Sequence, residues 1–529
     1  MSAAGVYDFI IVGAGSAGCV VANRLVRQTD SRVLLIEAGG PDSRPEIHQE
    51  RLSATLALWT GGELDWGYVT ESQRGLHDRA ISVARGKVWG GCSSINAMLH
   101  VRGSRLDYDR WAALGNAGWG YEDVLPFFRE SEDFEGGPSH YRGVGGPISV
   151  IYHADPTPVS KQLFAAGTEI GLRDRGGRFD YNGAEQEEIV FYYQTTKTRE
   201  HTRASAAVAY LYPILGAPNF TLRDRATATR LICRAGHVTG VEYVVDGRVE
   251  QVQAEQEVIL SCGAFGSPHL LMLSGIGPAP ELTAHGIGVV ADLPGVGQNL
   301  QDHMILGVGY LARQEHPFEP TLIAETGFFT RSQASDKEEP PDLQMLFGGV
   351  KFVSPRYDRE GPGFTFAPVI VQPRSVGSLT LRSASPHDAP VLQPNYLTHG
   401  DDIATFITGI EMARALAGTS ALADFVKTEI APGPGVTRRA DLVEFIRENA
   451  GTLWHPVGTC RMGDDDMAVV DARLRVHGVE GLRVADAAIM PRIVAGNTNA
   501  ACIMIGEKAS SLVLAAHHAV PPERGTDPP

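Results

Sequence analysis

The chain contains 529 residues, of which 43% are hydrophobic and 20% are charged. This size and composition predict a folded protein of two or three domains and exclude a disordered or fibrous chain. The formal net charge of −16, without a run of lysine or arginine, argues against nucleic-acid binding. The N-terminal residues have no basic segment, and glycines interrupt their apolar run, so we expect no signal peptide, no integral membrane segment and a cytoplasmic location.

The first predicted elements follow the order strand, helix, strand. Residues 7–12 (YDFIIV) are typical of a buried strand, and residues 19–28 (CVVANRLVRQ) are typical of a helix. Residues 32–40 (RVLLIEAGG) begin as a second buried strand that ends on an acid. This order predicts the start of a Rossmann-like domain.

A glycine motif joins the first strand to the helix. Gly13, Gly15 and Gly18 form G-x-G-x-x-G, which suits a tight turn, an open approach for a pyrophosphate and close helix–strand packing. Glu37, at the end of the second strand, is placed to accept hydrogen bonds from a ribose. Ser16 does not fit an esterase nucleophile, because the G-x-S-x-G pattern fails at Ala14. The motif predicts a bound dinucleotide and leaves NAD and FAD open.

Two further glycine-rich motifs follow along the chain. Residues 85–103 (RGKVWGGCSSINAMLHVRG) combine consecutive glycines with small hydroxyl residues, which would let a loop lie flat against a ligand. Residues 263–277 (GAFGSPHLLMLSGIG) follow the buried strand 257–263 and lead into a short apolar helix that ends at a Gly-x-Gly stop.

The three motifs, in this order, resemble those of the glucose–methanol–choline (GMC) family of FAD-dependent oxidoreductases. The fixed positions of the family's second signature are matched by Gly263, Ala264, Ser267, Pro268, Ser274, Gly275 and Gly277. The resemblance continues through residues 292–303, 376–386 and 481–491, so it covers nearly the whole chain.

The resemblance implies an α/β fold, α+β overall, with a Rossmann-like FAD-binding domain and a substrate domain that carries an antiparallel sheet flanked by helices. The FAD-binding domain would comprise residues 1–155, 205–305 and 460–516. The substrate domain would comprise residues 156–204 and 306–459, and residues 517–529 would form a flexible tail.

The resemblance also implies a set of FAD-binding residues, drawn from all three FAD-binding segments. These are Gly13, Gly15, Ser16, Ala17, Glu37, Ala38, Trp66, Arg85, Gly90, Gly91, Ser93, Asn96, Ala97, Met98, Leu99, Ala228, Trp454, Asp486, Ala487, Asn497 and Thr498.

The FAD is predicted to be non-covalent. Some choline-oxidising members of the family bond the flavin to a histidine after G-G-C-S-S, and this chain has Ile95 at that position. The six cysteines form no C-x-x-C pair, which favours free thiols over a disulfide framework. Cys92 and Cys460 have no adjacent resolving cysteine, so buried, inert thiols are expected.

His455, in the segment 451–463 (GTLWHPVGTCRMG), has several possible roles. A metal site with Cys460 would need two more ligands, and no metal-binding spacing supplies them. A Cys–His nucleophile pair would need an orienting third group. A structural histidine beside Pro456 is the remaining alternative. The family resemblance instead implies a general base in front of the flavin, because histidine titrates near neutrality and an alcohol must lose its hydroxyl proton.

A second catalytic residue is implied at Asn497, which would hydrogen-bond the substrate oxygen and stabilise the developing alkoxide. Asn499 is the competing candidate. Trp454 would lie against the flavin or the pocket wall, and a purely packing role is the alternative.

The predicted activity is the FAD-dependent oxidation of a primary alcohol (aromatic, furanic or aliphatic) to the aldehyde, with molecular oxygen or a quinone-like carrier as acceptor. The segments 341–358 and 364–375 are expected to line the substrate cavity, and the alternating apolar pattern of the second suits an uncharged substrate. The alternatives are a choline-type dehydrogenase, a lyase or photoenzyme of the same fold, a flavin-binding structural protein and an NAD enzyme. The oligomeric state is left open.

Overall fold

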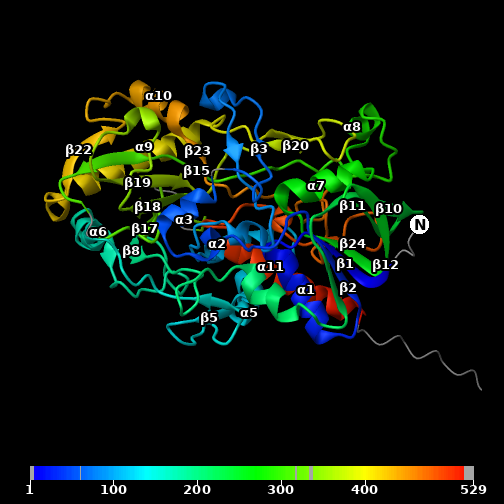
Figure 1. Cartoon of the computed structure of the whole chain (residues 1–529). Coiled ribbons are helices and arrows are strands. Elements are labelled where there is room, and N and C mark those ends of the chain that lie inside the picture. The colour runs from blue at the N-terminus through cyan, green and yellow to red at the C-terminus, as the bar shows by residue number, and fades with distance from the viewer. Residues whose placement is uncertain (1–4, 60, 316–317, 333–337, 518–529) are drawn as a thin grey trace, which may run out of the picture.

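The computed structural model describes residues 5–59, 61–315, 318–332 and 338–517, and two large sheets form its framework. A seven-stranded sheet lies at the right of Figure 1 and a nine-stranded sheet at its left. The predicted tail, residues 517–529, lies outside the described residues except for His517, the last residue of the final helix.

The seven-stranded sheet has the order β10-β11-β12-β1-β2-β9, and β24 pairs with the C-terminal part of β12. The strands β24, β12, β1, β2 and β9 run parallel, and β10 and β11 add an antiparallel hairpin to β12. The bounds are β1 Val6–Val12, β2 Val33–Ile36, β9 Phe220–Arg223, β10 Ala226–Arg234, β11 His237–Val245, β12 Arg248–Leu260 and β24 Leu482–Val484.

The predicted strand–helix–strand unit at the start of the chain is confirmed. β1 and β2 are its strands, and the helix between them is α1 (Ser16–Gln28). All four residues of β2 and the last four of β1 are buried, because both strands are internal to a parallel sheet. The third glycine motif forms α7 (Gly263–Leu273) directly after β12, also as predicted.

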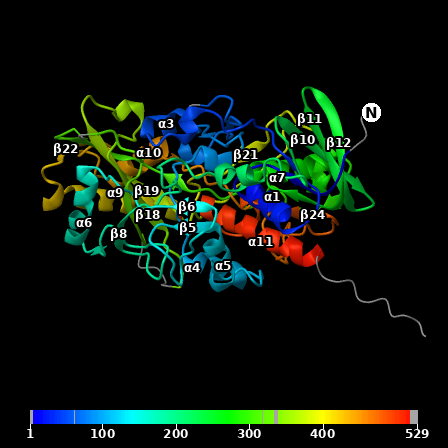
Figure 2. The ribbon, with the colours of Figure 1, turned by 60° about the horizontal axis from the view of Figure 1, so that its bottom comes forward.

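The first and last helices of the chain lie side by side. The final helix α11 (Asn499–His517) packs along α1 and against α5 (Tyr121–Ser131), as Figure 2 shows. By length and hydropathy α11 could also span a membrane, but 61% of that stretch is buried inside the protein. Its apolar composition is therefore accounted for by a position in the core.

The nine-stranded sheet has the order β22-β16-β19-β18-β17-β8-β7, and β15 joins β19 to β23. Its pairs are antiparallel except β7–β8. The bounds are β7 Arg173–Asp174, β8 Ile189–Tyr192, β15 Met304–Ile305, β16 Val308–Ala312, β17 Thr326–Thr330, β18 Leu343–Gly348, β19 Gly363–Ile370, β22 Val426–Ala431 and β23 Gly451–Thr452.

Side chains alternate across the nine-stranded sheet, so that its two faces have different neighbours. Phe347 of β18 and Phe366 of β19 belong to the core cluster that includes the helices α6 (Pro158–Glu169), α9 (Gly400–Ala417) and α10 (Arg439–Asn449). Leu346 and Ala367, their neighbours along the two strands, belong to another cluster on the opposite face. That second face is the one that the helices leave free.

The predicted fold class is confirmed, since a Rossmann-like sheet and a largely antiparallel sheet are each flanked by helices. The segments also interleave as expected, because strands of the first sheet come from residues 6–36, 220–260 and 482–484. One difference from the predicted domains is that β15 (Met304–Ile305) belongs to the second sheet, although the FAD-binding domain was expected to extend to residue 305. The domain boundaries themselves stay a prediction.

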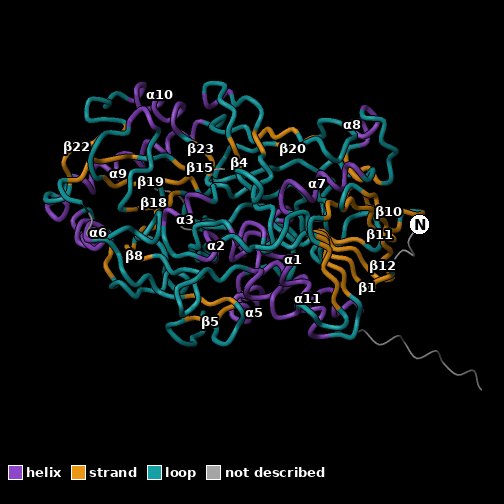
Figure 3. The backbone as a smooth tube through the Cα atoms, viewed as in Figure 1, coloured by secondary structure: helices purple, strands orange, loops and turns teal. Residues whose placement is uncertain are grey.

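Short elements and loops join and surround the two sheets, and the loops are the teal segments of Figure 3. They are α2 Pro45–His48, α3 Leu52–Ala57, α4 Arg105–Ala113, α8 Ala279–Ala284 and the strand pairs β3 Tyr68–Val69 with β4 Ser82–Val83, β5 Glu132–Phe134 with β6 Ile148–Val150, β13 Ile276–Gly277 with β14 Ala291–Asp292, and β20 Ser378–Thr380 with β21 Val391–Gln393.

Candidate active site

One cavity is lined by residues of both large sheets. It begins at the carboxyl ends of β1, β2 and β12 and reaches the helix-free face of the nine-stranded sheet. The carboxyl edge of parallel strands is the usual ligand-binding edge of such a sheet. The predicted site residues that line the cavity are Gly13, Gly15, Ser16, Ala17, Glu37, Ala38, Trp66, Arg85, Gly91, Asn96, Ala97, Met98, Leu99, Ala228, Trp454, His455, Asp486, Ala487, Asn497 and Thr498.

The three glycines of the first motif have different surroundings. A Cβ on Gly13 would lie 2.4 Å from the Ser261 carbonyl oxygen, and one on Gly18 would lie 1.9 Å from the Gly13 carbonyl oxygen. These two glycines therefore allow the close packing of α1 on the strands. At Gly15 the nearest atom would be 3.9 Å away, so this position is open towards the cavity. The free N–H groups at the start of α1 lie beside it and suit a phosphate.

Glu37 is held at the end of β2 by backbone donors. The Ala14 N–H donates to Glu37 Oε2 at 2.8 Å, and the Gly39 N–H donates to Oε1 at 2.7 Å. Burial raises the pKa of Glu37 to about 7, against the opposing effect of these donors. The Glu37 carbonyl accepts from Ala226 N–H at the start of β10, which brings the strand of Ala228 beside Glu37.

The C-terminal segment enters the same cradle through Asp486. Asp486 Oδ2 accepts from the Gly263 N–H at 2.9 Å and from the Ser267 hydroxyl at 2.6 Å, at the start of α7. Its Oδ1 accepts from Ala488 N–H at 2.8 Å. The carboxylate thus joins residues 486–488 to the third glycine motif.

Gly90 and Ser93 lie behind the wall of the cavity rather than in it. The Gly90 N–H donates to the Ala14 carbonyl at 2.8 Å, and its φ is 83°. The Ser93 hydroxyl donates to the Gly90 carbonyl at 2.6 Å and accepts from Ala206 N–H at 2.9 Å. Both residues shape the loop that presents Gly91 and Asn96.

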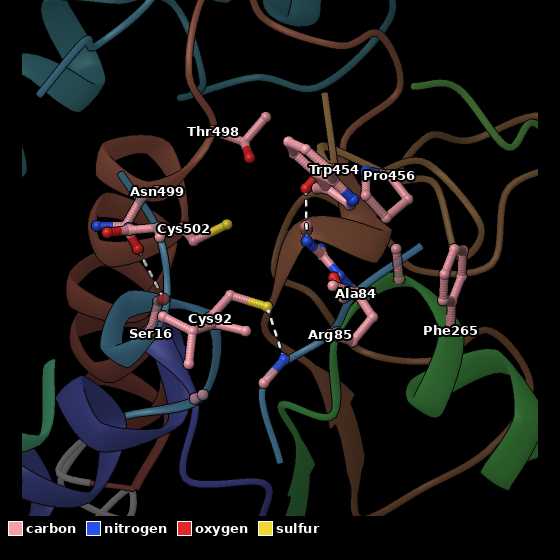
Figure 4. A pocket seen from close by; sticks show the side chains of 18 of the residues that line it. Ser16, Ala84, Arg85, Cys92, Phe265, Trp454, Pro456, Thr498, Asn499 and Cys502 are labelled. Atoms are coloured by element: carbon pink, nitrogen blue, oxygen red, sulfur yellow. Dashed lines mark hydrogen bonds between the residues drawn. The ribbon is translucent and has the colours of Figure 1, made fainter. Parts of the chain in front are cut away.

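The two candidate asparagines differ in their hydrogen bonds. The Ser16 hydroxyl donates to Asn499 Oδ1 at 2.8 Å, which ties the start of α11 to the start of α1 (Figure 4). Asn497 Oδ1 is buried without a hydrogen-bond partner, and both asparagines line the cavity. A buried acceptor without a partner is costly, so a hydrogen-bond donor on a bound molecule would be stabilised by Asn497 Oδ1.

The backbone around His455 is fixed by Asp302. Asp302 Oδ1 accepts from the His455 N–H at 2.8 Å, and Oδ2 accepts from the hydroxyls of Thr452 and Tyr396, each at 2.5 Å. Trp454, directly before the histidine, has a φ of 62° and donates its N–H to the Thr452 hydroxyl at 2.7 Å. The Trp454 carbonyl accepts from Arg85 Nη2 at 2.5 Å (Figure 4). These contacts hold Trp454 in a left-handed backbone conformation next to the candidate base.

A second histidine determines the tautomer of His455. His303 Nε2 lies 3.2 Å from the Val371 carbonyl oxygen, so it carries the proton and donates. In a neutral imidazole the other nitrogen accepts. His303 Nδ1 lies 3.0 Å from His455 Nδ1 and therefore accepts the His455 Nδ1–H. His455 Nε2 is left with its lone pair.

Both imidazoles are neutral at pH 7. Burial lowers the pKa of His303 to about 3. Burial, then the neighbouring His303 and then Arg85 lower the pKa of His455 well below its ordinary value. His455 is thus a free base at neutral pH, with one nitrogen available to a molecule in the cavity.

Of the two thiols that were expected to be buried and inert, Cys460 is buried and Cys92 is only partly buried. Burial raises the pKa of Cys460 far above its ordinary value, so the thiol stays protonated. Cys92 lines the cavity, and its sulfur accepts from the Gly86 N–H at 3.4 Å (Figure 4). Among the described residues, no group of three or more His, Cys, Asp or Glu side chains is arranged to hold a metal ion.

Sequence reasoning missed three residues of the site, namely Asp302, His303 and His269. Asp302 and His303 close the motif 292–303, and an acid beside a histidine in a stretch followed by apolar residues was a usable signal. His269 lines the cavity from α7, and its Nε2 is buried without a partner. Burial lowers the pKa of His269 to about 4.

A glycine-lined dinucleotide cradle that shares one cavity with a neutral histidine defines a cofactor-dependent oxidoreductase. The chain belongs to the GMC oxidoreductase family: the family's N-terminal model matches residues 7–305 and its C-terminal model matches residues 373–506. GMC oxidoreductases are FAD-dependent. The open side of Gly15 and the partnerless atoms of Asn497 and His269 fit such a group.

The chain is similar to proteins of several activities. It is 40% identical to an alcohol dehydrogenase [acceptor] of Pseudomonas putida, over 96% of each chain. It is 41% identical to an oxygen-dependent choline dehydrogenase of Sinorhizobium fredii, over 96% of this chain and 95% of the relative. Among solved structures, the pyridoxine 4-oxidase of Mesorbium loti superposes with a TM-score of 0.90 at 35% identity, over 97% of this chain and 100% of the other.

Proposed function

We propose that the protein oxidises a primary alcohol, aromatic, furanic or aliphatic, to the aldehyde. The observation that carries this proposal is that a base with one free nitrogen and an asparagine with a partnerless side-chain oxygen line the same cavity as the dinucleotide cradle. Bound FAD supplies the hydride acceptor, its N5. The relatives support the proposal, because an alcohol dehydrogenase and a pyridoxine oxidase are among them.

His455 takes the hydroxyl proton in this proposal. Its Nε2 is unprotonated at pH 7. Burial keeps the His455 ring neutral, so the ring carries one N–H proton, and that proton is on Nδ1, where it is donated to His303. When Nε2 accepts the proton, the positive charge is delocalised over the His455 ring, whose Nδ1–H already donates to His303. Removal of the proton makes the neighbouring C–H bond a better hydride donor.

Asn497 binds the substrate oxygen. Its amide N–H donates to the hydroxyl oxygen and stabilises the negative charge that develops as His455 takes the proton. The support for Asn497 over Asn499 is that the hydrogen bond from Ser16 fixes the Asn499 side chain, whereas the Asn497 side-chain oxygen has no partner. A donor of this kind is worth about 10²–10³-fold in rate.

The FAD is held without a covalent bond. The support is that Ile95, a side chain without a nucleophile, lines the cavity where some choline oxidisers have their histidine. Trichloroacetic acid is expected to precipitate a colourless protein and leave the flavin in the supernatant. A yellow pellet would contradict this part of the proposal.

The test of the function is anaerobic flavin reduction by benzyl alcohol, furfuryl alcohol and hexan-1-ol, followed at the flavin absorbance maximum. The variant His455→Ala is expected to remain yellow but to be reduced about 10²–10⁴-fold more slowly, the usual contribution of a general base. An unchanged rate would remove His455 from the mechanism, and no reduction by any alcohol would refute the function.

Reoxidation separates two acceptors in the same experiment. Molecular oxygen and a quinone-like carrier are both consistent with the proposal, so the reduced enzyme is mixed first with oxygen and then with an artificial quinone. A rate with oxygen close to the turnover number identifies an oxidase, and a rate only with the quinone identifies a dehydrogenase. The second candidate function, choline dehydrogenation, is favoured only by the identity to relatives of that activity.

A further inference from the structure

The substrate end of the cavity is formed by two paired strands. Leu346 of β18 lies opposite Ala367 of β19, and Gly348 lies opposite Thr365. All four residues line the cavity. Three of them are apolar. Ala367 presents only a methyl group to the cavity, whereas a Cβ on Gly348 would lie 1.8 Å from the Ile323 carbonyl oxygen, so this glycine lets the Ile323 segment pack against β18.

The remaining wall of this end is apolar as well. It is formed by Leu99, Ile305, Ile323, Phe352 and Leu453. Thr365 is polar, but its hydroxyl is occupied: it donates to the Val350 carbonyl at 2.8 Å and accepts from Phe352 N–H at 2.8 Å. Thr365 therefore holds the loop of Phe352 in place and does not add a charged partner for a ligand.

No carboxylate faces this end of the cavity in the part of the chain that the structure describes. Glu37 and Asp486 line the cavity at the strand ends of the other sheet, within the dinucleotide cradle. Asp302 contacts His455 from behind, and its two oxygens already accept three hydrogen bonds. Arg85 lines the cavity and is near enough to lower the pKa of His455, whereas Asp302 is not among the lining residues, so the charged side chain that the cavity presents near the base is positive.

We propose that the substrate is a neutral alcohol with an apolar body and that quaternary ammonium alcohols such as choline are excluded. A cation taken into an apolar cavity needs a carboxylate or a ring of aromatic faces to replace its water. Here two of the aromatic side chains that line the cavity, Trp59 and Trp454, pack on each other with 5.2 Å between centroids, which leaves each of them at most one face for a ligand. Arg85 adds repulsion. The inference rests on the proposed function and separates it from that of the choline-oxidising relatives.

The test compares choline with 3,3-dimethylbutan-1-ol, which has the same shape but a carbon in place of the charged nitrogen. With the FAD-loaded enzyme, kcat/KM for the neutral alcohol is expected to exceed that for choline by at least ~100-fold, because only the charge differs. Equal values, or a preference for choline, would overturn the inference.

A designed variant tests the cause. Ile323 lines the cavity and lies between β16 and β17, outside the regular strands. Ile323→Asp is expected to shift the ratio towards choline by roughly tenfold or more, since the new carboxylate pairs with the ammonium group. Ile323→Asn, nearly identical in shape and uncharged, is the control and should leave choline disfavoured. An equal gain in both variants would mean that volume rather than charge excludes choline.

Binding measurements keep the inference separate from the proposed function. Both alcohols are titrated into the oxidised enzyme, and the flavin absorbance reports their dissociation constants without turnover. If neither alcohol reduces the flavin but the neutral one binds more tightly, the proposed function fails and the inference stands. If choline binds more tightly, the inference fails whatever the turnover.

Discussion

At the scale of single residues, His303 decides which nitrogen of His455 is basic. His303 Nε2 donates to Val371, and so its Nδ1 must accept from His455. Without that acceptor the Nδ1–H tautomer of His455 is no longer favoured, and part of the protein carries the proton on Nε2 and has no base facing the substrate. His303 is therefore a positioning residue, since it acts through His455.

His303→Ala is expected to slow flavin reduction by less than the ~10²–10⁴-fold that loss of a general base costs. In the pH profile of the flavin-reduction rate, the fall in rate on the acid side should also move to higher pH, because His303 is one of the groups that lower the pKa of His455. The measurement is the rate of anaerobic reduction from pH 5 to 9.

The matched control is His303→Asn, whose side-chain oxygen can still accept from His455 Nδ1. It should recover part of the rate that the alanine variant loses. Equal rates and pH profiles in both variants would assign His303 a role in packing alone.

At the scale of elements, the contact of α1 with β1 depends on glycines that differ in purpose. Gly18 meets the Gly13 carbonyl, whereas Gly15 is open towards the cavity. Gly18→Ala is expected to destabilise the protein by about 1–3 kcal/mol, because the added methyl group pushes the helix from the sheet. The thermal midpoint of the FAD-free protein measures this effect.

Gly15→Ala is the control for that element. The FAD-free variant should unfold at the same temperature as the natural protein, because the nearest atom to the added carbon is 3.9 Å away. It should bind FAD more weakly, as shown by flavin release in dilute solution. A destabilised Gly15→Ala with normal FAD binding would contradict the assignment of the open side.

At the scale of the whole molecule, buried neutral histidines make folding sensitive to acid. Burial lowers the pKa of His100, His269, His303 and His455 in the folded state. Below pH 6.5 the histidines of the unfolded chain bind protons, whereas those of the folded chain stay neutral. The free energy of unfolding therefore decreases as the pH is lowered, until the pH reaches the folded pKa. Buried carboxylates with raised pKa, Asp107 among them, act in the opposite direction.

A single variant isolates one histidine from this sum. With a folded pKa of about 4, His269 is expected to lower the free energy of unfolding by about 2 kcal/mol between pH 7 and pH 5. His269→Gln should lose less stability over that interval than the natural protein, measured by urea unfolding. His140→Gln, at an exposed position, is the control and should follow the natural protein.

The parts of the site that were predictable are those set by contacts within one short segment. The turn from Gly13 to Gly18 and the acid Glu37 follow from a strand–turn–helix–strand order that allows few geometries. The pairing of His303 with His455 joins segments 152 residues apart, so no local pattern contains it. Gly90 and Ser93 show the reverse limit: they belong to the right motif, but the loop conformation places them behind the wall.

The sequence alone determined the fold class and the family, and it predicted the residues of the dinucleotide cradle, because buried strands and glycine turns are encoded by neighbouring residues. Tertiary structure decided the tautomer of His455, the different hydrogen bonding of Asn497 and Asn499 and the apolar character of the substrate end. Each of these depends on which side chains from distant segments meet in one cavity and on what water they exclude there.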